Sequence, residues 1–186
     1  IKLGSGVLTG PIECITTGRA DLALGVAASN TSTAGLQLQD LGDITFVFAV
    51  APTHPLAHIE TPISDEMLQA HRLVVVADSA QRERTSMGLL NGQDIFTVDS
   101  VQAKINAQVR GLGCGFLPEA MARPYVEAGL LHIKTVTRPT RQVRIRYGWK
   151  KPSNGSLGKA MQWWLEQLES PVTQQALLEK HLCPHL

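Results

Sequence analysis

The stretch Gly18-Arg19-Ala20-Asp21-Leu22-Ala23-Leu24-Gly25 marks a turn from a helix into a buried strand. Ahead of it, Thr9-Gly10-Pro11 is a typical helix start, because threonine caps helices and proline fits the first helical position. Gly18 supplies the C-terminal stop of that helix. Residues 21–26 are largely apolar, as in a buried parallel strand. The stretch therefore predicts a helix–strand unit of an α/β fold.

Outward from this unit, helical and strand-like patterns alternate along the chain. The patterns predict strands at 36–41, 45–51, 72–77, 95–98, 111–118, 130–136 and 143–149, and helices at 64–68, 101–110, 119–129, 156–169 and 172–182. Such alternation favours an α/β fold with mainly parallel sheets.

The charge and cysteine content narrow the function classes. The 186 residues carry 17 Lys and Arg against 16 Asp and Glu, a net charge of +1. Proteins that hold nucleic acid through its phosphates usually have a basic excess, so this chain is not expected to bind DNA by itself. It has no run of roughly 20 apolar residues that would span a membrane. Cys14, Cys114 and Cys183 lie far apart, which fits free thiols in the cytoplasm and no CxxC zinc or redox site.

Two further stretches accompany residues 18–25. They are Phe48-Ala49-Val50-Ala51-Pro52-Thr53-His54-Pro55-Leu56 and Val109-Arg110-Gly111-Leu112-Gly113-Cys114-Gly115-Phe116-Leu117-Pro118. In this order and spacing, the three stretches resemble the regulatory, effector-binding domain of LysR-type transcriptional regulators. The resemblance extends to about Leu168.

The resemblance implies a two-lobed type II periplasmic-binding-protein-like fold, with two crossover strands and a ligand cleft between the lobes. Lobe I would comprise residues 1–52 plus 138–186, and lobe II residues 53–137. The winged helix-turn-helix of such regulators is not in the chain, and neither are the first strand and helix of lobe I. The resemblance thus implies a chain truncated at its N-terminus.

The implied function is sensing without catalysis. A small-molecule effector, an organic acid or an aromatic compound, would bind between the lobes and shift the geometry of a homodimer or homotetramer. DNA would be bound only through the helix-turn-helix domain, with no cofactor and no membrane contact. A periplasmic-type solute-binding protein of a transport system and an enzyme of unknown class remain the alternatives.

Candidate ligand-binding residues follow from a general rule for open α/β sheets. Ligands bind outside the carboxyl ends of strands, often at helix N-termini. The residues in such places are Gly6, Leu8, Thr9, Gly25, Val26, Asp78, Ser79, Asp99 and Ser100. The amides and hydroxyl at Thr9 could hold a carboxylate, or Thr9 could simply cap its helix. Asp99 or Ser100 is expected to be an N-cap, and a role as ligand contact is compatible with that.

Other residues invite a functional interpretation that the sequence does not favour. Arg82 or Arg84 could clamp a carboxylate, although such mixed-charge runs are usually solvated loops. His54 is expected to be structural or on the surface, and Cys114 a buried, inert thiol. No metal site is predicted, and Gly111 to Gly115 lack the spacing of a phosphate-binding loop.

Overall fold

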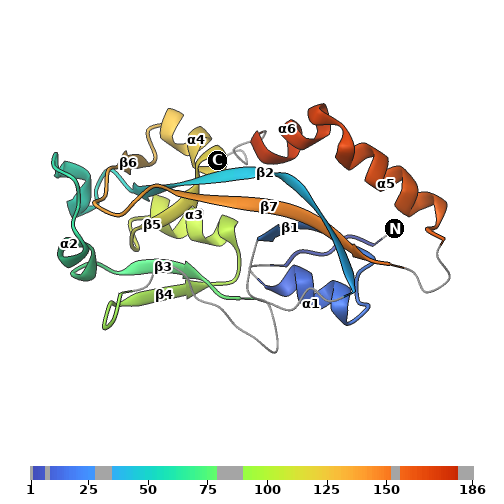
Figure 1. The fold of residues 1–186 in the computed structure, drawn as a ribbon. Coiled ribbons are helices and arrows are strands. Elements are labelled where there is room, and N and C mark those ends of the chain that lie inside the picture. The colour runs from blue at the N-terminus through green and yellow to red at the C-terminus, as the bar shows by residue number, and fades with distance from the viewer. Residues whose placement is uncertain (1, 7–8, 28–34, 79–89, 152–155, 180–186) are drawn as a thin grey trace. The chain divides into compact units, whose positions relative to one another are not determined.

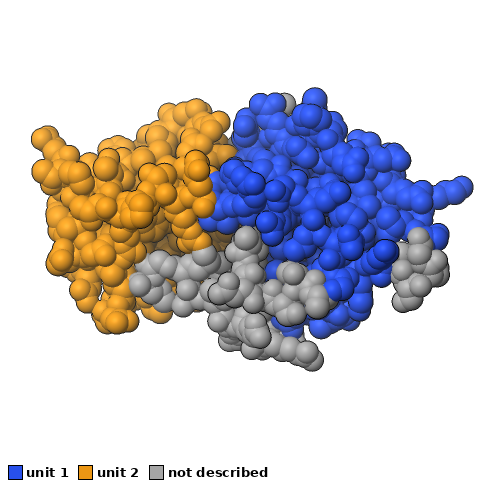
Figure 2. All heavy atoms as spheres, viewed as in Figure 1, with its two compact units in different colours: residues 1–44, 78–85, 143–180 blue, residues 45–77, 86–142, 181–186 orange. Residues whose placement is uncertain are grey.

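The computed structural model describes residues 2–6, 9–27, 35–78, 90–151 and 156–179. The chain forms two compact units, which Figure 2 colours separately. Unit 1 comprises residues 1–44, 78–85 and 143–180, and unit 2 comprises residues 45–77, 86–142 and 181–186. Two of the passages between the units fall inside strands β2 (Leu36–Val50) and β7 (Arg141–Lys150), which are neighbours in one sheet (Figure 1).

Unit 1 is built on an antiparallel pair of strands covered by helices. Strand β1 (Leu22–Ala27) pairs with β7, with Leu22 opposite Trp149. Helix α1 (Gly10–Thr16) packs on β1 through the buried side chains of Ile12 and Ile15. Helices α5 (Lys159–Glu169) and α6 (Pro171–Glu179) follow β7. A second cluster joins β2, β7 and α5 through Leu41, Ile145, Tyr147 and Leu168.

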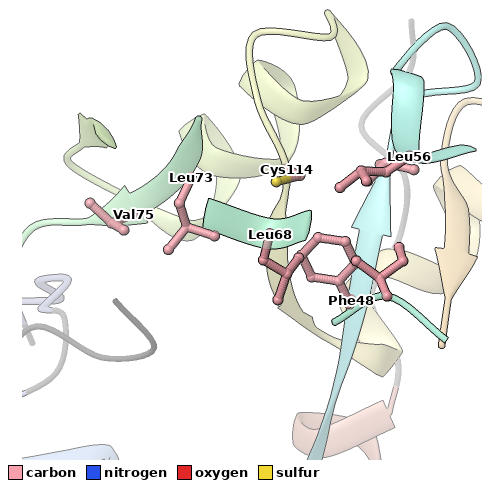
Figure 3. Packing of buried hydrophobic residues seen from close by; sticks show 8 residues of the cluster. Phe48, Leu56, Leu68, Leu73, Val75 and Cys114 are labelled. Atoms are coloured by element: carbon pink, nitrogen blue, oxygen red, sulfur yellow. The ribbon is translucent and has the colours of Figure 1, made fainter. Parts of the chain in front are cut away.

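Unit 2 contains the parallel pair β3 (Leu73–Val76) and β4 (Ile95–Val98). Strands β5 (Gly115–Pro118) and β6 (His132–Lys134) pair antiparallel with the second half of β2. The helices are η1 (Pro55–His58), α2 (Asp65–Gln69), α3 (Val101–Val109) and α4 (Glu119–Glu127). Figure 3 shows the largest buried cluster, with side chains of β2, η1, α2 and β3 and the thiol of Cys114.

Two predictions about the strands are wrong. Residues 36–41 and 45–51 do not form two strands but the single strand β2. In addition, the named strands in the described residues are not mainly parallel: β1–β7, β2–β5 and β2–β6 are antiparallel, and β3–β4 is parallel. Helix–strand alternation sets the direction of strands only when consecutive strands are neighbours, and these antiparallel neighbours are far apart in sequence. The other predicted helices and strands are confirmed in type, with shifted ends.

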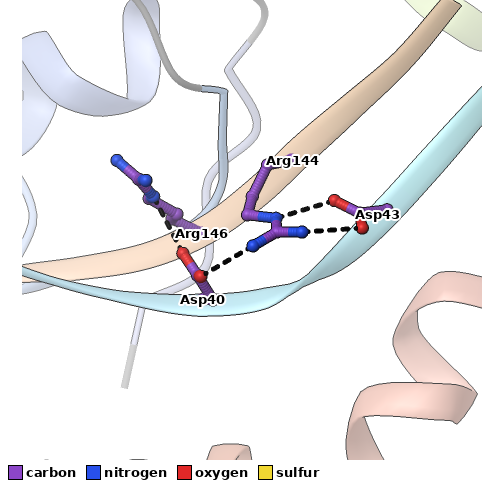
Figure 4. Close-up of polar contacts among 4 residues, drawn as sticks. All are labelled: Asp40, Asp43, Arg144 and Arg146. Carbon is purple, nitrogen blue, oxygen red and sulfur yellow. Dashed lines mark hydrogen bonds and ion pairs between the residues drawn. The ribbon is translucent and has the colours of Figure 1, made fainter.

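A group of charged side chains explains why β2 continues through its polar middle (Figure 4). Arg144 of β7 donates to Asp43 of β2 through Nε at 2.8 Å and Nη2 at 3.0 Å, and it also reaches Asp40 at 3.3 Å. Arg146 donates to Asp40 at 2.9 Å. The Arg144 hydrogen bond lowers the pKa of Asp43. The polar residues between the two apolar runs of β2 thus have cross-strand partners and stay in the ladder.

Candidate functional site

The start of helix α1 holds a carboxylate, and it is the protein's own. The backbone N–H of Thr9 donates to Oδ1 of Asp78 at 3.1 Å, and the Thr9 hydroxyl donates to Oδ2 at 2.6 Å. Both residues are buried, with exposed fractions of 7% and 9%. The amide and hydroxyl of Thr9 therefore do hold a carboxylate, but it is the side chain of Asp78 and not a ligand. Thr9 is the N-cap residue by position, yet its side chain makes no hydrogen bond to the helix backbone, so the simple capping role is wrong.

The other candidate residues of unit 1 differ in what they offer a ligand. Gly6 is exposed and lies beside Pro11. Gly25 has a φ of +79° at a bulge in β1, and an added Cβ there would meet nothing within 4 Å. Val26 is buried against α1, so its side chain serves packing. Leu8 and Ser79 lie outside the described residues, as do Arg82 and Arg84.

In unit 2, the predicted capping at the start of α3 is confirmed for Ser100. Its hydroxyl accepts a hydrogen bond from the N–H of Ala103 at 3.1 Å. Asp99 precedes it and is exposed. A role of Asp99 and Ser100 as ligand contacts stays a prediction.

One turn into α3 lies a cationic side chain that the sequence analysis missed. Burial lowers the pKa of Lys104 to about 8, although the residue keeps some contact with solvent. Burial likewise raises the pKa of the neighbouring Cys114 thiol to about 11, so this thiol is neutral and inert at pH 7. Lys104 flanks the apolar stripe of Val101, Ile105 and Val109. A lysine beside an apolar stripe is the signal that could have revealed it.

Gln108 follows one turn later on the same helix face and is fully buried. Neither its side-chain nitrogen nor its side-chain oxygen has a hydrogen-bond partner among the described residues. A Cβ added to Gly115 would lie 2.8 Å from Nε2 of Gln108 and 3.2 Å from Cε of Lys104. Glycine at position 115 thus allows both side chains to lie against the backbone of β5.

His54 is structural and buried. Its Nδ1 accepts a hydrogen bond from the N–H of Leu56 at 3.2 Å, and its ring centroid lies 5.0 Å from that of His71. Burial, and secondarily His71, lowers the pKa of His54. In the described part of the chain, no group of three or more His, Cys, Asp or Glu side chains could hold a metal ion. The helices described there include none that is long and apolar enough to cross a membrane.

The profile of the LysR substrate-binding domain matches residues 1–171. This chain belongs to the LysR substrate-binding domain family. Among curated relatives of this LysR domain, the HTH-type transcriptional regulator YeeY of Escherichia coli K12 is 36% identical over 169 residues, which are 90% of this chain and 54% of YeeY. The chain thus spans about half the length of that relative.

Solved structures of LysR regulatory domains share the fold. The regulatory domain of MetR from N. meningitidis matches with a TM-score of 0.61 and 17% identity, covering 91% of this chain and 76% of that one. The effector-binding domain of QuiR in complex with shikimate matches with a TM-score of 0.62 and 14% identity, covering 92% and 78%. The predicted α/β fold of the periplasmic-binding-protein type is confirmed.

Proposed function

We propose that this chain senses a small-molecule effector for a LysR-type transcriptional regulator and catalyses no reaction. One observation carries the proposal: the family match is continuous over residues 1–171, and the matched relative YeeY is a helix-turn-helix regulator. The net charge of +1 supports a division of labour in which DNA is bound by a helix-turn-helix part outside this chain. A regulator that binds DNA would act in the cytoplasm.

The proposed mechanism is a shift between conformations. An effector moves such an equilibrium only by the difference between its affinities for the two states. Assembly as a homodimer or homotetramer, with lobe I at 1–52 plus 138–186 and lobe II at 53–137, would carry the shift to the DNA-binding parts. Unit 1 offers Gly6 and the backbone at Gly25 to an effector, and unit 2 offers Ser100 and, to a hydroxyl group of the effector, the carboxylate of Asp99.

A small organic acid is the proposed effector class. Two structural neighbours support it, because QuiR was solved with shikimate and the CcmR regulatory domain with 2-PG. The test is a screen of small organic acids and aromatic compounds against the whole regulator, read by thermal unfolding and by DNA affinity.

At least one compound should raise the unfolding temperature and change the DNA affinity in the same concentration range. Mass spectrometry of the bound compound distinguishes the alternatives. Chemical conversion of the compound would make the protein an enzyme. Binding without any effect on DNA affinity would favour a solute receptor.

A further inference from the structure

Lys104 is a desolvated cation whose charge has no partner in the described residues. The ion pairs found there do not include it, and the titratable groups near it are another cation, Arg141, and the thiol of Cys114, which is neutral at pH 7. A buried charge without a counter-charge is unfavourable, and proteins normally pair it or do without it. The folded chain therefore keeps a positive charge where folding alone would not place one.

Gln108 gives a second, independent indication at the same place. Buried amide groups almost always have hydrogen-bond partners, because an unmade hydrogen bond costs free energy. Both polar atoms of Gln108 lack one in the described residues, and Nε2 lies near the same point above Gly115 as Cε of Lys104. An unused donor and a cation thus converge on one short stretch of the β5 backbone.

The surroundings favour an anion there. Lys104 follows the Ser100 cap by one helical turn, with its N–H bonded to the Ser100 carbonyl at 3.0 Å, and the N-terminal turn of a helix carries partial positive charge. Arg141, stacked at 5.3 Å over the ring of Phe46, adds a second cation close enough to affect the ammonium of Lys104. Each of these features repels the lysine and attracts a negative group.

We propose that Lys104 and Gln108 of α3 form an anion site in unit 2 that binds a carboxylate group of the effector. One ammonium and one amide N–H match the two oxygens of a monoanionic carboxylate. The amide oxygen of Gln108 would accept from a hydroxyl next to that carboxylate. This inference rests on the proposed function, since it assigns the charge of the effector and the side chain that recognises it.

Acetate is the probe, because the effector itself is unidentified. The 186-residue chain is titrated with sodium acetate at constant ionic strength, with chloride as the balancing anion, and backbone amide signals are followed by NMR. We expect the signals of residues 104, 108 and 115 to shift saturably with acetate and not with acetamide, its neutral counterpart. Absence of a saturable shift at these residues overturns the inference.

Four variants connect the binding to the proposed atoms. Lys104→Met and Gln108→Leu should each weaken acetate binding, the former at least about tenfold, whereas Lys104→Arg keeps the charge and should retain binding. Lys159→Met removes the same charge from an exposed position of unit 1 and is the matched control, with affinity expected within about twofold. Equal weakening by Lys159→Met, or none by Lys104→Met, contradicts a specific site.

The outcomes also separate this inference from the proposed function. If an effector found by screening changes DNA affinity equally in the natural regulator and in Lys104→Met, only the inference fails. If acetate binds through Lys104 but no compound alters DNA affinity, the inference stands and the regulatory function fails.

Discussion

Replacing Lys104 with methionine should make the isolated chain more stable. Most substitutions of partly buried residues destabilise a fold, so this direction is informative. The reason is that the ammonium is desolvated in the folded chain and hydrated in the unfolded one, without a carboxylate in the described residues to compensate. Methionine has a similar length and fills the same space with an apolar side chain.

The magnitude follows from proton affinity. The pKa of Lys104 falls from 10.5 to about 8, and a tenfold change in proton affinity corresponds to about 1.4 kcal/mol, so the upper limit of the cost is about 3.5 kcal/mol. Solvent reaches part of the side chain and screens part of this cost, so we expect Lys104→Met to gain about 1–2 kcal/mol at pH 7.

The pH dependence has a definite sign. Between pH 8 and 10.5 the unfolded chain binds a proton at Lys104 that the folded chain does not, so the natural protein should gain stability as the pH rises. Cys114 acts oppositely between pH 9 and 11, because the folded chain keeps the thiol proton there and thereby loses stability. The contribution of Lys104 is therefore best isolated between pH 8 and 9, where the advantage of the methionine variant should begin to shrink.

Urea unfolding at pH 7.0, 8.0 and 9.0, with Lys159→Met as the exposed control, measures these differences. The control should change the free energy of unfolding by no more than about 0.5 kcal/mol. A Lys104→Met variant that is less stable than the natural chain at pH 7 would refute the reasoning. It would mean that the ammonium has a stabilising partner and is not poised for an external anion.

Three other changes test separate parts of the structure. Asp78→Ala removes the acceptor of both Thr9 hydrogen bonds and should lower the free energy of unfolding by about 2–3 kcal/mol in urea; a loss below about 0.5 kcal/mol would contradict the buried pairing. Gly113→Ala places a Cβ 2.6 Å from the Arg72 carbonyl and should cost about 2–3 kcal/mol, seen as a lower thermal midpoint, whereas an unchanged midpoint would contradict the close approach. Burial lowers the pKa of His54 in the folded chain. As the pH drops below 6.5, the unfolded chain therefore binds a proton at His54 before the folded chain does, and the stability should fall. In His54→Asn, the thermal midpoint should depend less on pH between pH 7 and 5. An unchanged pH dependence would mean that other groups cause it.

The sequence predicts the local structure well where a short-range signal exists. Pro11 and Gly18 bound α1 closely, and the Ser100 cap starts α3 as expected. Turn and cap residues act within a few positions, so their effect can be recognised without knowing the fold. The direction of the strands depends on which distant segments become neighbours. No local pattern carries that information, which is why the expected parallel sheet is wrong for β1, β2 and β7.

The same distinction applies to the candidate site. The sequence predicts that both Thr9 and Asp78 can meet a ligand, because each lies after a strand or before a helix. That they bind each other, 69 positions apart, depends on the tertiary fold. Lys104 was missed for the complementary reason. A lysine within a helix is ordinarily solvated, and only the packing of α3 against β3 and β5 shows that this one is desolvated.

Two helix starts that look alike in sequence therefore differ in the charge they can still accept. At α1, the carboxylate of Asp78 already accepts both hydrogen bonds that Thr9 donates, so these donors are not available to an incoming carboxylate. At α3, Ser100 satisfies the N–H of Ala103 without charge, and the nearby ammonium of Lys104 has no anion among the described residues. If the effector is an acid, its charged group is expected on α3, and unit 1 is left to contact neutral or hydrogen-bond-donating parts of the molecule. If the effector carried no negative charge, binding would not compensate for the free energy lost by desolvating Lys104. The stability of Lys104→Met relative to the natural chain measures that free energy directly.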